Sequence, residues 1–191
     1  MGALSQEQGA GLEAFLDDQC DWLRRAGVAD VRRVKAPLNK VRKGPRKGFF
    51  VCVHSGEPHV DYQGTLRVPG LPWSVGVSFD AKSSDCATSF PFGDVLDSQV
   101  RFLRSKAQAG ALAFLYVRST HGTAVDYVLP VDGEGAIAGI HHRRSGGVLV
   151  ADELRRESAP WSHLESQGLV VPVGASWARV VRRLLQEGQW P

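Results

Sequence analysis

A nearly continuous apolar stretch at residues 111–117, Ala-Leu-Ala-Phe-Leu-Tyr-Val, most constrains how this chain can fold. A strand that is apolar on both sides has to be covered on both faces, as at the centre of a parallel or mixed sheet. The preceding residues, 94–109, predict a helix that ends before Gly110. The apolar stripe of this helix comprises Leu96, Val100, Leu103 and Ala107. A helix followed by a buried strand predicts an α/β fold.

The strand candidates before this helix lie at residues 49–53, 59–66 and 73–82. The last alternates well, with two sets of side chains on opposite faces. One set is Trp73, Val75, Val77 and Phe79, and the other is Ser74, Gly76, Ser78 and Asp80. A strand, a helix and a second strand in succession permit a right-handed crossover at the sheet centre.

Further elements are predicted at both ends of the chain. Residues 10–26 and 176–186 have the apolar spacing of amphipathic helices, and residues 124–131 predict one more strand. The expected order is therefore helix, three strands, helix, two strands and a helical tail. We expect one domain over residues 1–191, in which residues 133–191 form a C-terminal extension.

Composition narrows the class of protein. Hydrophobic residues make up 43% and charged residues 23%, as in ordinary globular proteins. No apolar run approaches the roughly 18 residues of a membrane span, so no membrane partner is expected. Residues 1–8 lack the pattern of a signal peptide, which favours a cytoplasmic protein. Three scattered cysteines without zinc-site spacing are interpreted as reduced thiols.

Positive charge is concentrated in residues 33–58, where glycines and prolines favour a loop or a projecting arm. No Asp or Glu occurs between Asp30 and Glu57. Uncompensated positive charge of this kind is typical of a polyanion-binding surface, although a merely solvated charged loop is the alternative. The basic residues expected to contact DNA are Lys35, Lys40, Arg42, Lys43, Arg46 and Lys47.

The candidate chemical site consists of Asp61, Asp80 and Lys82. Asp80 and Lys82 are two residues apart, so on a strand their side chains share a face. Asp61 precedes Asp80 by a length that suits two adjacent strands and a turn, so a hairpin can gather all three. Two carboxylates suit Mg²⁺ or Mn²⁺, and such an ion with a nearby ammonium suits phosphodiester hydrolysis. The alternative is the exposed face of an ordinary strand.

Several segments together resemble the RecU-type Holliday junction resolvases, within the wider restriction-endonuclease-like PD-(D/E)xK nucleases. They occur in the family's order between about residues 11 and 132. The segments are Gly11-Leu12-Glu13, Asp61-Tyr62-Gln63-Gly64, Phe79-Asp80-Ala81-Lys82, Thr88-Ser89-Phe90-Pro91-Phe92 and Gln99. The resemblance implies a mixed sheet flanked by helices with an α-β-β-β-α-β-β core, and a basic stalk that reaches into a four-way junction.

The resemblance also implies roles for individual residues. Asp61 and Asp80 would be metal-binding carboxylates, with the carbonyl of Ala81 as a further ligand, and Lys82 would be the motif lysine. Glu13 would help to complete the metal site from the first helix. Gln99 would be the active-site glutamine of the second helix. The residues around Gln99 support this independently, since an amide on the packing face of a helix needs a partner; a glutamine that reaches solvent is the alternative.

The sequence departs from the family at three positions. Val60 replaces the proline of the superfamily motif, His59 stands where the family often has threonine, and Asp80 replaces the commoner glutamate. The shorter side chain at position 80 should move the metal by roughly an ångström, which matters because catalytic geometry is tight.

The expected function is therefore paired, metal-dependent cleavage of four-way DNA junctions, in a bacterial cell or a phage-infected host. Two matched cuts in a nearly two-fold junction predict a homodimer. The alternatives are a restriction- or repair-type nuclease that acts on duplex DNA, and a non-catalytic protein that binds junctions as an architectural element.

Overall fold

The structure is a computed structural model that describes residues 2–34, 38–43, 50–54, 60–145, 148–151 and 157–191. Side chains are described for residues 10–34, 60–141 and 157–191. The elements are α1 (Gly2–Arg25), β1 (Ala29–Arg33), β2 (Leu38–Lys43), β3 (Phe50–His54), β4 (Tyr62–Arg67), β5 (Ser74–Ser84), β6 (Ser89–Pro91), the 3₁₀ turn η1 (Phe92–Asp94), α2 (Asp97–Gln108), β7 (Leu112–Ser119), β8 (Val125–Pro130), β9 (His142–Ser145), β10 (Val148–Ala151), β11 (Ser158–Pro160), α3 (Trp161–Ser166), β12 (Val170–Val171) and α4 (Trp177–Gln186).

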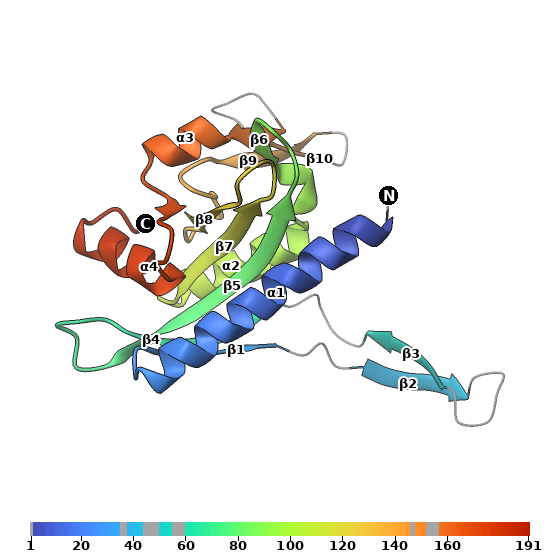
Figure 1. Cartoon of the computed structure of the whole chain (residues 1–191), viewed down its shortest axis with the longest axis horizontal. Coiled ribbons are helices and arrows are strands. Elements are labelled where there is room, and N and C mark those ends of the chain that lie inside the picture. The colour runs from blue at the N-terminus through green and yellow to red at the C-terminus, as the bar shows by residue number, and fades with distance from the viewer. Residues whose placement is uncertain (1, 35–37, 44–49, 55–59, 146–147, 152–156) are drawn as a thin grey trace.

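A six-stranded mixed sheet in the order β1-β4-β5-β7-β8-β12 forms the centre of the molecule (Figure 1). The pair β5–β7 is parallel and is joined through α2, whereas the other pairs in this sheet are antiparallel. Every residue of β7 from Leu112 to Val117 is buried, as its apolar run predicts. The expected α/β fold, with a mixed sheet flanked by helices, is confirmed.

The assignment of the first strands is partly wrong. The strand that pairs with β4 in the sheet is β1, at residues 29–33, and residues 50–54 instead form β3, which pairs with β2 outside the sheet. In β1 only Ala29 and Val31 are buried, and its outer positions are charged. Those charges make β1 resemble the start of the basic stretch, and only the pairing with β4 distinguishes it.

The hairpin β2–β3 lies within the basic segment and is drawn to one side of the sheet and helices (Figure 1). A register shift between Lys40 and Arg42 marks a bulge in β2. The segment predicted as a loop or arm therefore contains a two-stranded ladder. The ladder pairs backbone N–H and C=O groups of the two strands with each other. The hairpin can therefore extend from the body without relying on solvent to pair all of these groups.

Aromatic rings anchor the helices to one face of the sheet. Phe79 on β5 stacks on Tyr62 of β4 and on Phe114 of β7, with ring centroids 4.8 and 4.7 Å apart. Trp177 of α4 lies 5.4 Å from the Phe79 ring and is fully buried. The predicted alternation of β5 therefore holds at its buried end, although Trp73 lies before the strand and is 65% exposed.

Gly64 in β4 allows the backbones of β1 and β4 to approach. A Cβ atom at this position would lie 2.0 Å from the carbonyl oxygen of Asp30 and 2.6 Å from the Cα atom of Val31. Only a residue without a side chain fits there. The glycine of the Asp-Tyr-x-Gly segment thus has a packing reason, because it allows β4, which begins directly after Asp61, to lie close to β1.

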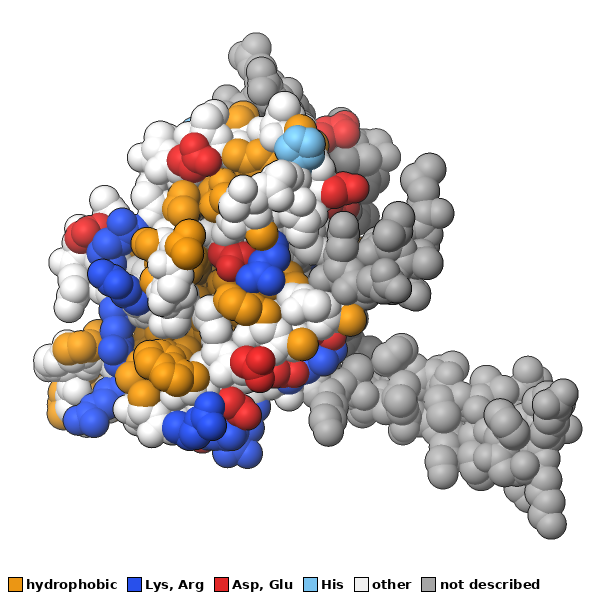
Figure 2. Space-filling view, in the orientation of Figure 1, with side chains coloured by type: hydrophobic (Ala, Val, Ile, Leu, Met, Phe, Trp, Pro, Cys, Tyr) orange, Lys and Arg blue, Asp and Glu red, His pale blue; other side chains and the backbone are white. Residues whose placement is uncertain are grey.

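Other expected features need smaller corrections. Leu96 does not belong to the apolar stripe of α2, because it precedes the helix and is 55% exposed. The C-terminal extension contributes β11, α3 and β12 in addition to the expected helix, which is α4. Among the described residues, no helix combines the length and apolar character needed to cross a membrane. Figure 2 shows hydrophobic side chains at the surface beside Lys and Arg, over the C-terminal end of α1 and over α4.

Candidate active site

Asp80 and Lys82 lie on one face of β5. The Asp80 side chain is fully buried, and the Nζ atom of Lys82 lies 2.8 Å from its Oδ2 atom. Lys82 itself is 18% exposed, so part of its side chain reaches the surface beside the buried carboxylate. The strand alternation places Phe79 on the opposite face, where it anchors the core. One strand therefore supplies both a core residue and a buried ion pair.

Asp61 lies immediately before β4 rather than within it, which corrects the expected strand boundary. Its Oδ2 atom accepts a hydrogen bond from the backbone N–H of Ala81, at 2.9 Å. Its own carbonyl oxygen accepts a bond of 2.7 Å from the N–H of Val34, directly after β1. Asp61 is thus held between the end of β1 and Ala81 of β5, the residue that separates Asp80 from Lys82.

Gln99 reaches the site from the first turn of α2. Its Nε2 atom donates a 2.8 Å hydrogen bond to Oδ1 of Asp80. Its Oε1 atom accepts a 3.0 Å bond from the N–H of Leu96, one of the backbone groups that a helix start leaves without an internal partner. The side chain is 8% exposed. The alternative of a glutamine that points into solvent is wrong.

The protonation of Asp80 is strongly perturbed. Burial raises the pKa of this carboxyl from its ordinary value to about 7, and the neighbouring Asp61 carboxylate also raises it, whereas the Lys82 ammonium lowers it. A buried carboxylate costs free energy unless cations or donors compensate it. Any cation that binds Asp80 therefore stabilises its charged form, which suits a role as a metal ligand.

The oxygen atoms present suit a hard divalent cation. Although the Lys82 ammonium is close, Oδ2 of Asp80 is buried without a directed hydrogen bond from any described residue. The described side chains contain no cluster of three or more His, Cys, Asp or Glu that could hold a metal ion. An ion here would therefore rest on Asp61, Asp80, a backbone carbonyl such as that of Ala81, and waters, which is a set that Mg²⁺ accepts.

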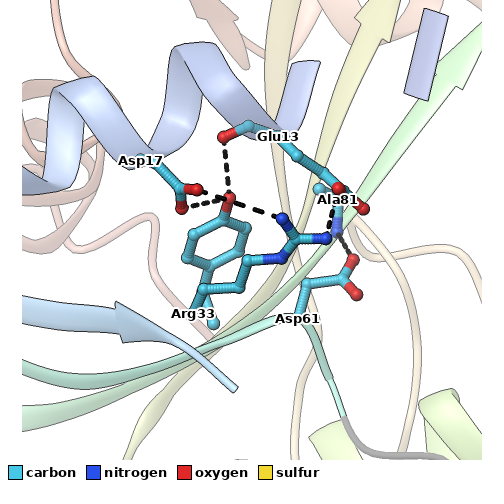
Figure 3. A network of polar contacts seen from close by, with 6 residues as sticks. Glu13, Asp17, Arg33, Asp61 and Ala81 are labelled. Atoms are coloured by element: carbon cyan, nitrogen blue, oxygen red, sulfur yellow. Dashed lines mark hydrogen bonds and ion pairs between the residues drawn. The ribbon is translucent and has the colours of Figure 1, made fainter. Parts of the chain in front are cut away.

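Glu13 lies at the edge of this site, where it is ion-paired with Arg33 (Figure 3). Arg33 ends β1 and lies opposite Tyr62 in the register with β4. The Tyr62 hydroxyl is 3.0 Å from both the backbone oxygen of Glu13 and Oδ1 of Asp17, so its single proton serves one acceptor at a time. The structure thus binds the Glu13 carboxylate to an arginine, and no described contact joins it to Asp61 or Asp80.

Sequence reasoning missed three charged residues around the trio. Arg33 was counted only in the basic stretch, although its place at the end of β1 brings it to Glu13. Asp94 lies within electrostatic range of Lys82 and of Asp85. Partial burial raises the pKa of Asp94, the Lys82 charge lowers it, and Asp85 raises it. Asp85 follows β5 closely enough to have been suspected, whereas Asp94 offers no sequence signal.

The residues after β5 are braced by the C-terminal extension. Strand β11 pairs antiparallel with β6, and Phe92 donates its N–H to the carbonyl of Glu157, at 2.8 Å. Trp161 donates its backbone N–H to the Thr88 carbonyl at 3.1 Å, and its ring Nε1–H to the Cys86 carbonyl at 2.9 Å. The Thr-Ser-Phe-Pro segment beside the site therefore depends on residues 157–161.

The predicted DNA-binding residues are only partly described. Lys40, Arg42 and Lys43 lie on β2, where the structure gives the backbone alone. Lys35, Arg46 and Lys47 lie outside the described residues. The charge of the hairpin thus follows from its sequence, and the direction of each basic side chain stays a prediction.

Fold and site together define an α/β protein with a buried aspartate–lysine ion pair on strand β5 and a second aspartate fixed beside it. The family model described as Recombination protein U, RecU, matches residues 7–133, which is more than half of the chain. The chain belongs to the RecU family. A protein from Geobacillus sp. (strain WCH70) named Holliday junction resolvase RecU is 23% identical over 167 residues, which cover 87% of this chain and 77% of the relative.

A solved structure of Hjc from Archaeoglobus fulgidus, described as a Holliday junction resolvase from an archaeal hyperthermophile, is also similar. It is 13% identical, the match covers 83% of this chain and 96% of that one, and the TM-score is 0.36. At that TM-score the likeness supports no conclusion about fold or site. The fold described above rests on the strand pairings of this chain.

Proposed function

We propose that this chain is a divalent-metal-dependent endonuclease that resolves Holliday junctions. One observation carries the proposal: in a member of the RecU family, the fully buried Asp80 carboxylate lies 2.8 Å from the Lys82 ammonium, with Asp61 fixed beside it. A buried carboxylate with a raised pKa is a common mark of a functional site. The name of the Geobacillus relative supports the choice of substrate.

Asp61 and Asp80 would hold Mg²⁺ or Mn²⁺, with the Ala81 carbonyl as a further ligand. When bound, such an ion supplies Lewis-acid stabilisation of the scissile phosphate and lowers the pKa of a bound water. Gln99 fixes the Asp80 carboxylate through its 2.8 Å hydrogen bond, so one oxygen of Asp80 is oriented before any ligand arrives. Lys82 supplies positive charge next to the place where negative charge develops on phosphate.

Glu13 would take part from α1. Its carboxylate is paired with Arg33, and both groups are partly exposed, so the pair is weak enough to rearrange when a polyanion approaches. Arg33 would then be free to contact phosphate, and Glu13 would be free to bind a metal-coordinated water.

The basic hairpin supports the choice of a four-way junction as substrate, as the family does. The basic hairpin would enter the open centre of a four-way junction and contact phosphates, which carry position rather than sequence information. Two matched cuts need two equivalent sites, and a C₂ homodimer supplies them. We therefore propose a homodimer as the active form.

The decisive experiment compares cleavage of a four-way junction and a matched linear duplex, with Mg²⁺, with Mn²⁺ and with EDTA. Asp80→Asn should abolish cleavage and retain junction binding. Asp21→Asn, which alters an exposed aspartate of α1, is the matched control and should cut as the wild type does. Full cleavage by Asp80→Asn would reject the site. Equal cutting of linear duplex would favour the restriction or repair alternative, and binding without cutting would favour an architectural protein.

The assembly is tested separately. Sedimentation velocity of the wild type, alone and with junction DNA, should give a dimer in both cases. A monomer under both conditions would reject the proposed arrangement of two sites while leaving the metal-dependent chemistry of one site intact.

A further inference from the structure

A groove lies between α1 and the segment that leads into α4. We call it the α1–α4 groove and define it by Trp22 and Leu23 on α1 and by Ala175, Ala178 and Arg179 on the other side. Its volume is about 970 Å³. Both helices lie on the Phe79 side of the sheet, whereas Asp80 points to the other side. The groove is therefore separate from the candidate active site.

The groove combines an aliphatic floor with exposed aromatic edges. Leu23 and Ala178 are almost fully buried within it, whereas Trp22 is 56% exposed and Phe15 is 36% exposed. A tryptophan that is half exposed on a single chain is a typical anchor of a protein interface. Its burial removes a large apolar area from water, and the side chain has few rotatable bonds to order. The floor can accept an inserted apolar side chain.

Three arginines of α4 line the same groove: Arg179, Arg182 and Arg183. Asp18 is the single carboxylate among the lining residues. Arg179 and Arg182 form no ion pair with any described residue, and the ion pair of Arg183 with Glu187 is long, at 4.0 Å between Nε and Oε2. Positive charge in the groove is therefore poorly compensated (Figure 2). A ligand that brings carboxylates would compensate it.

Arg182 already bonds the backbone of another basic residue, Arg67. Its guanidinium donates to the backbone oxygen of Arg67, at 2.9 Å from Nε, and burial and the Arg67 charge both lower its pKa. A cation near a second cation, and partly removed from water, gains from an anion. The arginines thus favour an acidic partner over a neutral one.

Two residues that line the groove each have one buried polar atom without a hydrogen-bond partner among the described residues. The atoms are Oε1 of Gln19, an acceptor, and Nε of Arg183, a donor. Buried polar atoms normally have hydrogen-bond partners. A peptide backbone offers both an N–H and a C=O, so it could pair with both atoms once the lining side chains shift to expose them. A phosphodiester backbone offers acceptors only.

We propose that the α1–α4 groove binds a short acidic segment of a partner protein, with one large apolar side chain inserted between Trp22 and the floor and with carboxylates on the α4 arginines. The occupant is a peptide rather than a DNA strand, because the groove has a floor of aliphatic side chains as well as positive charge. Single-stranded DNA, which stacks on aromatic residues in basic grooves, and a second copy of this chain are the rivals.

The experiment starts from a display library of random short peptides, selected on the full chain and counter-selected on the double variant Trp22→Ser with Arg179→Glu. The enriched peptides should share carboxylates next to one large apolar residue. The proposal would be overturned if the enriched peptides were neutral or basic. It would also be overturned if the wild type retained no peptide better than the double variant does.

Fluorescence anisotropy then measures the best peptide against each variant. Trp22→Ser and Arg179→Glu should each weaken binding at least about tenfold, and replacing the apolar anchor or the carboxylates of the peptide should do the same. Trp73→Ser is the matched control, since it removes an exposed tryptophan outside the groove. Unchanged affinity in the two groove variants would place the peptide elsewhere and reject the proposal.

The rivals are measured with the same variants. Labelled oligothymidylate that binds more tightly than any selected peptide, with the same dependence on Trp22, would reassign the groove to single-stranded DNA. Loss of the dimer in Trp22→Ser during sedimentation would assign it to a second copy. Junction cleavage should be unchanged in both groove variants, so failure of this inference and failure of the proposed function are distinguishable.

Discussion

The amide of Gln99 joins Asp80 to the start of α2, because Nε2 donates to Oδ1 of Asp80 at 2.8 Å while Oε1 accepts from the N–H of Leu96 at 3.0 Å. One side chain therefore caps a helix and orients a buried carboxylate. Since both ends of the amide are engaged, the Gln99 side chain is fixed, and the Asp80 carboxylate cannot rotate without loss of its hydrogen bond from Nε2. The crossover helix of the sheet thus sets the geometry of the candidate site.

Gln99→Ala should lower junction cleavage by about ten- to a hundredfold, because a hydrogen bond to a charged group contributes on the order of 1.5–3 kcal/mol. Single-turnover cleavage rates measure the effect. The matched control is Gln108→Ala at the other end of α2, where the side chain bonds the Gly133 carbonyl at the surface. A full rate in Gln99→Ala, with junction binding intact, would contradict a positioning role.

The raised pKa of Asp80 predicts how stability depends on pH in the absence of metal. Its folded-state pKa of about 7 exceeds the ordinary value of 3.8, so the folded protein holds a proton that the unfolded chain releases between these values. The contribution of Asp80 to the unfolding free energy is therefore greatest at low pH and is lost as the pH rises to about 7, by at most roughly 4 kcal/mol.

Asp80→Asn removes this dependence, so its stability relative to the wild type should increase from pH 4 to pH 7. Urea unfolding in EDTA across this range measures the difference, in which the titration of other groups largely cancels. A constant difference across the range would show that Asp80 titrates normally. With Mg²⁺ present, the wild type should instead gain stability as the pH rises, because the ion binds the deprotonated carboxylate.

Sequence reasoning succeeded where the pattern is local. The run at residues 111–117 and the two-residue spacing of Asp80 and Lys82 each depend on strand geometry alone. It failed where pairing between distant segments decides the outcome. Strand β1 was hidden because Arg32 and Arg33 continue the basic stretch, and only its ladder with β4 reveals it. Nothing local in residues 157–161 indicates that they pair with β6.

The candidate site shows the same division. The bond from Gln99 to Asp80 could be anticipated, since an amide on the buried face of a helix needs a partner. The ion pair of Glu13 with Arg33 could not, because it joins α1 to the end of an unrecognised strand.

Gly64→Ala should destabilise the protein by more than the usual glycine-to-alanine change, because its Cβ atom would lie 2.0 Å from the Asp30 carbonyl oxygen. The strands β1 and β4 would have to separate, which would also displace Asp61. We expect a loss of about 1–3 kcal/mol, as in overpacked cores, measured by urea unfolding. Gly93→Ala is the control, since nothing lies within 4 Å of a Cβ atom there. Equal effects of the two substitutions would contradict the close approach.

Removal of the positive charge of the basic hairpin should weaken junction binding and reduce its dependence on salt. The variant replaces Lys40, Arg42, Lys43, Arg46 and Lys47 with Gln. Each lost phosphate contact lowers the slope of log K against log salt by about 0.9 on duplex DNA. Anisotropy titrations at several salt concentrations measure it. An unchanged slope would reject a DNA-binding role for the hairpin.

Trp161→Phe tests the brace between the C-terminal extension and the segment beside the site. The substitution keeps an aromatic ring against Tyr127, whose ring centroid lies 5.0 Å away, and removes the Nε1–H that donates to the Cys86 carbonyl at 2.9 Å. Stability should fall by about 1 kcal/mol, as for one hydrogen bond. Hydrogen exchange should accelerate at Phe92, whose N–H donates to the Glu157 carbonyl. Trp190→Phe, which alters a partly buried ring near Phe114, should leave exchange at Phe92 unchanged. If hydrogen exchange at Phe92 is equally slow in both variants, the ring nitrogen of Trp161 does not hold the segment. The β6–β11 ladder alone is then enough to fix the segment beside Asp80.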